Sequence, residues 1–163
     1  FYYYFESKED VLQAMMEEID GGWSALLDPV LCLRVSAAEK LRLSISILRR
    51  HYAEAPSSLL AYHDVTDEML RYKSVTHSIQ ALVPPFVQII EQGIEEGSFK
   101  TQNPEGLAQM ALTVGRVLLD NNIFPSCEES WQWRVATVQH MLERGLQIPL
   151  GSLDLVAVWQ HPV

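Results

Sequence analysis

Residues 74–96, SVTHSIQALVPPFVQIIEQGIEE, decide the fold of this chain. Their apolar side chains recur every three or four positions, which is the period of one face of an α-helix. Pro84 and Pro85 lie inside the pattern, and a proline removes a backbone donor and clashes with the preceding turn. Because the apolar phase continues beyond the two prolines, we predict one helix with a kink near Val83. Gly97 then supplies a C-terminal cap.

The same period extends over most of the remaining sequence. Asp28-Pro29 marks the end of the first expected helix, and Asn103-Pro104 is a strong helix start. Only Leu153–Trp159 shows a partial strand-like alternation, and the sequence does not place this segment in the fold. We therefore predict an all-α domain with about six helices. Besides 74–96, the expected helices are 7–27, 36–56, 57–70, 104–121 and 127–146, and capping boxes open three of them (Ser7 with Asp10, Ser36 with Glu39, Ser126 with Glu129).

The composition indicates one folded domain with an acidic surface. The chain has 163 residues, of which 48% are hydrophobic and 20% charged. No apolar run reaches the ~18 residues that a membrane span needs. The net charge is −9, from 21 acidic and 12 basic residues, so these residues as a body are repelled by the phosphates of nucleic acid. Cys32 and Cys127 are too few for a disulfide framework, and we expect buried or partly buried thiols in a reducing cytoplasm.

Two motifs carry a resemblance to a known family. Residues 1–12, FYYYFESKEDVL, resemble the junction between the recognition helix and the next helix in TetR-type transcriptional regulators. Residues 90–99, IEQGIEEGSF, followed by NPEGLA at 103–108, resemble the junction between the seventh and eighth helices of TetR effector domains. The residues that match the first motif are Phe1, Tyr2, Tyr4, Phe5, Ser7, Lys8, Asp10 and Leu12.

The resemblance implies a TetR-like domain organisation in a chain that lacks most of the N-terminal helix-turn-helix domain. Residues 1–6 would be the end of the DNA-recognition helix, 7–149 the effector-binding and dimerisation domain, and 150–163 a C-terminal tail. It further implies a cytoplasmic, ligand-responsive regulator, a repressor, that is not an enzyme and needs no cofactor. As a homodimer it would bind operator DNA through the missing domain. In the full-length parent, the residues contacting DNA would be Tyr2, Tyr4 and Lys8.

The resemblance also implies a dimer interface and an effector cavity. The helices at 104–121 and 127–146 would pair with those of a second copy in a four-helix bundle. The expected interface residues are Leu107, Ala111, Val114, Leu118, Trp131, Val135, Val138 and Leu142. A small hydrophobic effector would enter an apolar cavity with the Pro84-Pro85 kink on its wall. The expected lining residues are Met16, Trp23, Tyr52, Tyr62, Phe86 and Met110, with His63 as the polar residue that orients the ligand.

The acidic balance favours a neutral or cationic hydrophobic effector over a large anionic one. The alternative is a helical enzyme or metal-binding bundle. His63 and Asp67 lie four residues apart on one helical face, which is compatible with a metal site. An exposed acidic face with an incidental histidine accounts for the same pattern more simply, so we predict no metal site. No nucleophile elbow and no glycine-rich phosphate loop occurs in the sequence, which makes an enzyme the weaker hypothesis.

Overall fold

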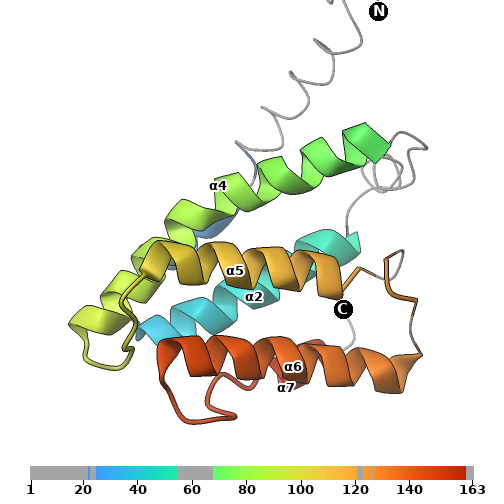
Figure 1. The fold of residues 1–163 in the computed structure, drawn as a ribbon. Coiled ribbons are helices and arrows are strands. Elements are labelled where there is room, and N and C mark those ends of the chain that lie inside the picture. Colours follow the sequence, from blue (N-terminus) through green and yellow to red (C-terminus); the bar gives the residue numbers. More distant parts are fainter. Residues whose placement is uncertain (1–21, 23–24, 55–67, 121–122, 126, 161–163) are drawn as a thin grey trace, which may run out of the picture.

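The computed structural model describes residues 22, 25–54, 68–120, 123–125 and 127–160. All regular structure among them is helical, which confirms the predicted all-α class. Residues 25–31 are the end of a first helix. The helices that follow are α2 (Ala37–Glu54), α4 (Glu68–Glu95), α5 (Pro104–Leu118), α6 (Glu128–Leu146) and the short α7 (Leu155–Gln160) (Figure 1).

The predicted boundary at Asp28-Pro29 is wrong, whereas the predicted start of α2 is confirmed. The first helix continues through Pro29, since a proline removes only its own hydrogen bond and the Cys32 N–H still donates to the Asp28 carbonyl (3.2 Å). At the start of α2, the Ser36 hydroxyl accepts from the Glu39 N–H (3.3 Å), as the capping box predicts.

Helix α4 is continuous through its two prolines. The preference for one helix over two is therefore confirmed. The helix is longer than predicted, because it begins at Glu68, in sequence that was expected to form a separate helix. Pro85 is buried and Pro84 is exposed. The proline pair thus lies with one member in the core and the other at the surface.

A tight turn holds α4 against α5. Gly93 has no side chain where the Phe99 ring packs, and a Cβ atom built there would lie 2.0 Å from Phe99 Cδ2. Gly97 has a φ of 73°, which a glycine adopts without strain. Asn103 Oδ1 accepts from the Gly106 N–H at 2.8 Å, which confirms the predicted cap of α5. The two helices leave this turn antiparallel and diverge toward the N-terminal half of α4 (Figure 1).

The carboxylate of Glu96, in the turn directly after α4, caps the neighbouring α2. Glu96 Oε2 accepts from the Ala37 N–H (3.1 Å), and Gln92 Nε2 donates to the Val35 carbonyl (2.9 Å). Gln92 also donates to Glu96, and these hydrogen bonds, that from Gln92 first and that from Ala37 second, lower the pKa of the Glu96 carboxyl. The start of α2 is therefore fixed by tertiary contacts as well as by Ser36.

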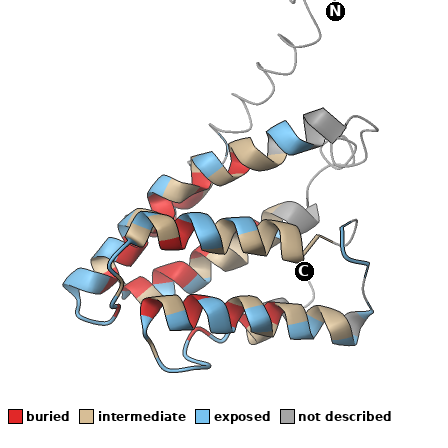
Figure 2. Ribbon diagram, viewed as in Figure 1, coloured by how far each residue is buried: buried red, intermediate tan, exposed pale blue. Residues whose placement is uncertain are grey.

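The core lies where the helices face one another, and the exposed residues lie on the outer sides (Figure 2). It is built mainly of aliphatic side chains, with Phe86 and Phe99 as its buried aromatic residues. Burial of such side chains is the main source of stability in a domain of this size. The buried hydrophobic residues of the core cluster are Leu27, Ala37, Leu41, Leu48, Leu82, Phe86, Ile89, Ile90, Phe99, Leu107, Ala108, Val135, Leu142, Leu146, Leu153 and Leu155.

The C-terminal segment is helical, which corrects the strand-like reading of Leu153–Trp159. Two buried side chains of α6, Gln139 and Glu143, accept hydrogen bonds from the backbone of this C-terminal segment. Glu143, fully buried, accepts from the Gly151 and Leu153 N–H groups (2.8 and 3.0 Å). Gln139 accepts from the first N–H group of α7, at Leu155 (2.8 Å), and donates to Glu143. A six-residue helix is too short to be stable alone, so these contacts, together with packing on α2 and α6, hold it in place.

The predicted cap of α6 cannot be assessed at Ser126, which lies outside the described residues. The residue at the N-cap position is Cys127, which makes no side-chain capping hydrogen bond. Both α5 and α6 are close to their predicted extents, although α5 ends at Leu118.

We predict that Glu143→Gln lowers the free energy of unfolding by about 2 kcal/mol, because an amide group replaces an acceptor that faces backbone N–H groups. Urea unfolding followed by circular dichroism measures this difference. Glu91→Gln, an exposed change on α4, is the control and should stay within about 0.5 kcal/mol of wild type. Equal stabilities of the two variants would show that Glu143 does not stabilise the C-terminal segment.

A second prediction compares two helical glycines. Gly93→Ala should lower the unfolding free energy by about 1–3 kcal/mol, because the new Cβ overlaps the Phe99 ring. Gly115→Ala should raise it by about 0.5–1 kcal/mol, because no neighbouring atom lies within 4 Å of the place that the new Cβ would take and alanine favours the helix. Thermal unfolding of both variants measures the difference, and a stabilised Gly93→Ala protein would contradict the close packing of Phe99 on Gly93.

Candidate functional site

A groove of about 1030 Å³ lies between the diverging parts of α4 and α5. Its volume is comparable with the ~300–1,000 Å³ that small-molecule sites usually enclose. Most of its surface is apolar, and among the described residues that line it only Glu105 is charged. Pro84 lies on its wall, whereas Pro85 is buried and does not line it. The lining residues are Tyr72, Val75, Thr76, Ile79, Gln80, Val83, Pro84, Glu105, Gln109, Thr113, Val117 and Ile123.

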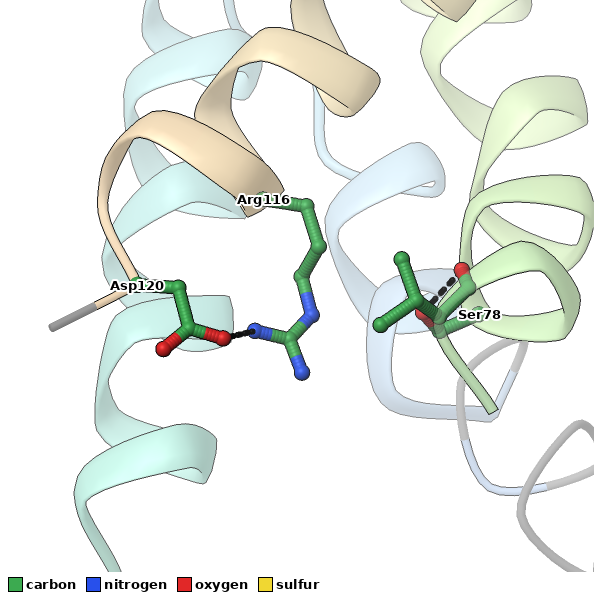
Figure 3. Close-up of polar contacts among 4 residues, drawn as sticks. Ser78, Arg116 and Asp120 are labelled. Carbon is green, nitrogen blue, oxygen red and sulfur yellow. Dashed lines mark hydrogen bonds and ion pairs between the residues drawn. The ribbon is translucent and has the colours of Figure 1, made fainter. Parts of the chain in front are cut away.

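A charged pair lies beside this groove, at the C-terminal end of α5. Arg116 Nη1 is 3.8 Å from Asp120 Oδ2, and the two side chains are only 16% and 10% exposed. Figure 3 shows the Arg116 guanidinium between the Asp120 carboxylate and Ser78 of α4. Ser78 is buried, and its hydroxyl donates to the Val75 carbonyl (2.9 Å). The interface between α4 and α5 therefore contains a cation that is largely withdrawn from water.

A further buried hydroxyl lies on α2. Ser44 is completely buried, and its Oγ makes no hydrogen bond to any part of the chain that the structure describes. Such a group has a desolvation cost of about 1–3 kcal/mol. Nothing in the structure joins Ser44 to the groove, so we do not count it among the site residues.

Two of the predicted effector-binding residues lie outside the groove. Phe86 is buried in the core cluster. Met110 is 39% exposed on another face of α5. One position along a helix rotates a side chain by ~100°, which is enough to move a residue off the face that lines the groove. The other predicted lining residues or their side chains lie outside the described residues: Met16, Trp23, Tyr52, Tyr62 and His63.

The predicted DNA-contacting residues, Tyr2, Tyr4 and Lys8, also lie outside the described residues, as do His63 and Asp67 of the metal alternative. In the described part of the chain, no group of three or more His, Cys, Asp or Glu side chains could hold a metal ion. The same part contains no helix that is long and apolar enough to cross a membrane.

The two cysteines are exposed free thiols, which corrects the expectation that they are buried. The Cys127 thiol lies at the start of α6, where the proximity of the Ser130 backbone and then of its hydroxyl (3.5 Å from Sγ) lowers the pKa of the thiol. Neither cysteine lines the groove.

The predicted dimer-interface residues fall into two groups. Leu107, Val135 and Leu142 are buried within a single chain, so their apolar character is explained without a partner. For example, Leu107 packs directly on Gly145 of α6: a Cβ atom built at Gly145 would lie 2.4 Å from Leu107 Cδ1. They therefore leave little apolar surface for a partner to cover. The remaining predicted interface residues are half-buried: Ala111, Val114, Leu118, Trp131 and Val138.

Three large apolar side chains of α5 and α6 are exposed instead. Met110 and Met141 are each 39% exposed, and Trp133 is 71% exposed. A single apolar side chain at the surface needs no explanation, whereas several on two adjacent helices indicate an interaction surface. None of the three was predicted at the interface, because sequence periodicity identifies the most apolar stripe of a helix, and that stripe faces the core.

The groove residues of α4 were missed for a related reason. Tyr72, Thr76, Ile79 and Val83 recur at helical spacing, rotated by about one position from the core stripe. The sequence did contain an indication that Arg116 is unusual, because the only other charged residue of α5 is Glu105. A lone arginine in an apolar helix, with an aspartate four residues later, marks a buried ion pair.

Comparison with known proteins identifies the class. Residues 62–141, which include α4, α5 and most of α6, match the family model of the tetracyclin repressor-like C-terminal domain. This match and the all-helical fold support membership of the TetR family of transcriptional regulators. Domains of this family are regulatory. No curated protein matches the sequence.

Proposed function

We propose that this chain is the effector-sensing and dimerisation part of a ligand-responsive TetR-type repressor. The observation that carries the proposal is the α4–α5 groove inside the region that matches the family model. Its size and mainly apolar lining suit a small hydrophobic molecule. The regulator would act in the cytoplasm and bind operator DNA through a helix-turn-helix domain, with Tyr2, Tyr4 and Lys8 at the DNA surface.

Helix α5 would connect effector binding to dimer geometry. Glu105, Gln109, Thr113 and Val117 of α5 line the groove, at the i, i+4 spacing of a single face. Met110, on the neighbouring face, is exposed toward a partner. A ligand between α4 and α5 would favour the arrangement of α5 that accommodates it. It would therefore shift the population of dimer geometries, provided that it binds them with unequal affinity.

If the groove binds an effector, a suitable ligand should raise the Tm of the protein, and a substitution that fills the groove should remove this rise. A panel of hydrophobic compounds, anionic, neutral and cationic, should contain at least one that raises the Tm. At about a hundredfold excess over its Kd, the expected rise is about 5–10 °C. Thr113→Trp places a large ring in the groove and should abolish the rise, as differential scanning fluorimetry would measure.

Gln88→Trp is the matched control, an exposed change on α4 outside the groove, and it should leave the ligand-induced shift intact. A panel in which no compound stabilises the wild-type protein, at any charge, would refute the effector hypothesis.

We also propose that α5 and α6 form the homodimer interface, through Met110, Val114, Trp133, Val138 and Met141. Isologous contact of these two helices would give a four-helix bundle and cover the exposed apolar side chains. Val114 and Val138 are half-buried and stay in the proposed interface, as the sequence predicted. Met110, Trp133 and Met141 are exposed and take the place of Leu107, Val135 and Leu142, which are buried within a single chain.

Light scattering coupled to gel filtration should report about twice the chain mass for the wild-type protein. Met141→Glu should weaken the dimer by about tenfold or more, because a carboxylate would be desolvated at the interface. Leu33→Glu, at an exposed apolar residue in the loop before α2, is the control and should remain dimeric. A wild-type monomer at micromolar concentration would exclude this interface.

A further inference from the structure

The charge on the groove wall is negative. Among the described residues that line the groove, only Glu105 is charged. Gln109 Nε2, one turn further along α5, donates to its carboxylate (3.1 Å), and no cation in the described part of the chain forms an ion pair with it. Arg116, the other charged residue of α5, pairs with Asp120 and does not line the groove. A ligand in the groove would therefore meet a carboxylate that no cation of the described chain compensates.

The position of Glu105 in α5 explains why an acid is stable there, but not which ligand it suits. The residue lies in the first turn of the helix, where the helix dipole favours a negative charge. Its side chain is exposed, so the free carboxylate is hydrated. A ligand that lies against it removes part of this water, which costs free energy unless the ligand supplies a positive charge. Glu105 therefore favours a cationic group over a neutral one and disfavours an anionic group.

The carboxylate lies at one end of the groove, and much of the apolar lining lies toward the other end. Helices α4 and α5 run antiparallel (Figure 1), so Pro84 lies at the same end as Glu105, and Tyr72 at the same end as Val117. The amide of Gln80 lies toward the Glu105 end. At about 1.5 Å of rise per residue, Glu105 and Val117 are about 18 Å apart along the helix axis. This lining suits an elongated molecule with a polar group at one end.

We infer that the effector is an elongated hydrophobic monocation and that Glu105 binds its positively charged group. This inference rests on the proposed effector function of the groove. The apolar part of the molecule would extend away from Glu105 along aliphatic lining residues of both helices. The net charge of the chain, −9, acts in the same direction, because a negative surface attracts cations and repels anions. The aliphatic residues in question are Val75, Ile79, Val117 and Ile123.

The test uses three probes with the same alkyl chain, octylammonium, octanol and octanoate, at concentrations below their aggregation limits. Isothermal calorimetry and thermal shift measure their binding to the wild-type protein. We expect octylammonium to bind about threefold to tenfold more tightly than octanol, which is what one ion pair at an exposed carboxylate provides. Octanoate should bind no better than octanol.

Glu105→Gln should remove the preference for octylammonium while octanol binding persists, which also shows that the variant is folded. Glu105→Lys should reverse the preference toward octanoate, because the charge at the end of the groove changes sign. Glu91→Gln, at an exposed acid of α4 outside the groove, removes the same unit of net charge and should bind the three probes as wild type does. This control separates contact with Glu105 from the general attraction of cations to an acidic chain.

An unchanged octylammonium preference in Glu105→Gln would overturn the inference, as would an equal loss of that preference in Glu91→Gln. If octanol or octanoate binds in a Thr113→Trp-sensitive manner and octylammonium binds no more tightly, the effector function stands and the assignment of a cationic effector fails. If no compound of any charge binds, both proposals fail.

Discussion

The close contact between Gly93 and the Phe99 ring is the constraint on which the arrangement of α4 and α5 depends. A side chain at position 93 would occupy the place of the ring, so only glycine lets the turn after α4 fold back against the helix. The turn brings α5 alongside the C-terminal half of α4, where Ile89 and Ile90 are buried. Because the helices meet at this end and cross at an angle, they separate at the other, and the groove lies there (Figure 1).

The opposite side of the domain is fixed by polar contacts. Gln139 and Glu143 hold the backbone of the C-terminal segment, and Arg49 of α2 donates to the Val158 carbonyl of α7. Helix α7 therefore connects α2 with α6. Buried polar networks stabilise a fold when their members are satisfied, and in this one each acceptor faces a donor.

The sequence predicts the features that depend on local chemistry. The cap at Asn103, the capping box at Ser36 and the left-handed Gly97 each follow from a few adjacent residues, and the structure confirms them. Helix α7 was not predictable, because its N-terminus is satisfied by Gln139, sixteen residues away in the chain. The groove was not predictable in the same way. Pro84 lines it, whereas Phe86 and Met110 do not, since a wide apolar surface on a helix does not reveal which stripe faces the core.

Helix α5 contacts three different environments: the core, the groove and the outer surface. Leu107 and Ala108 face the core, Thr113 and Val117 face the groove, and Met110 faces outward. A helix presents such faces at angles of ~100° per residue, so a small rotation of α5 changes all three surfaces together. The core face resists rotation, because Leu107 fits against Gly145 without room for another atom. The C-terminal end, where Arg116 and Asp120 lie, is furthest from the turn that anchors α5 to α4. Under the proposed function, a ligand at this end therefore acts where α5 is least constrained by that turn.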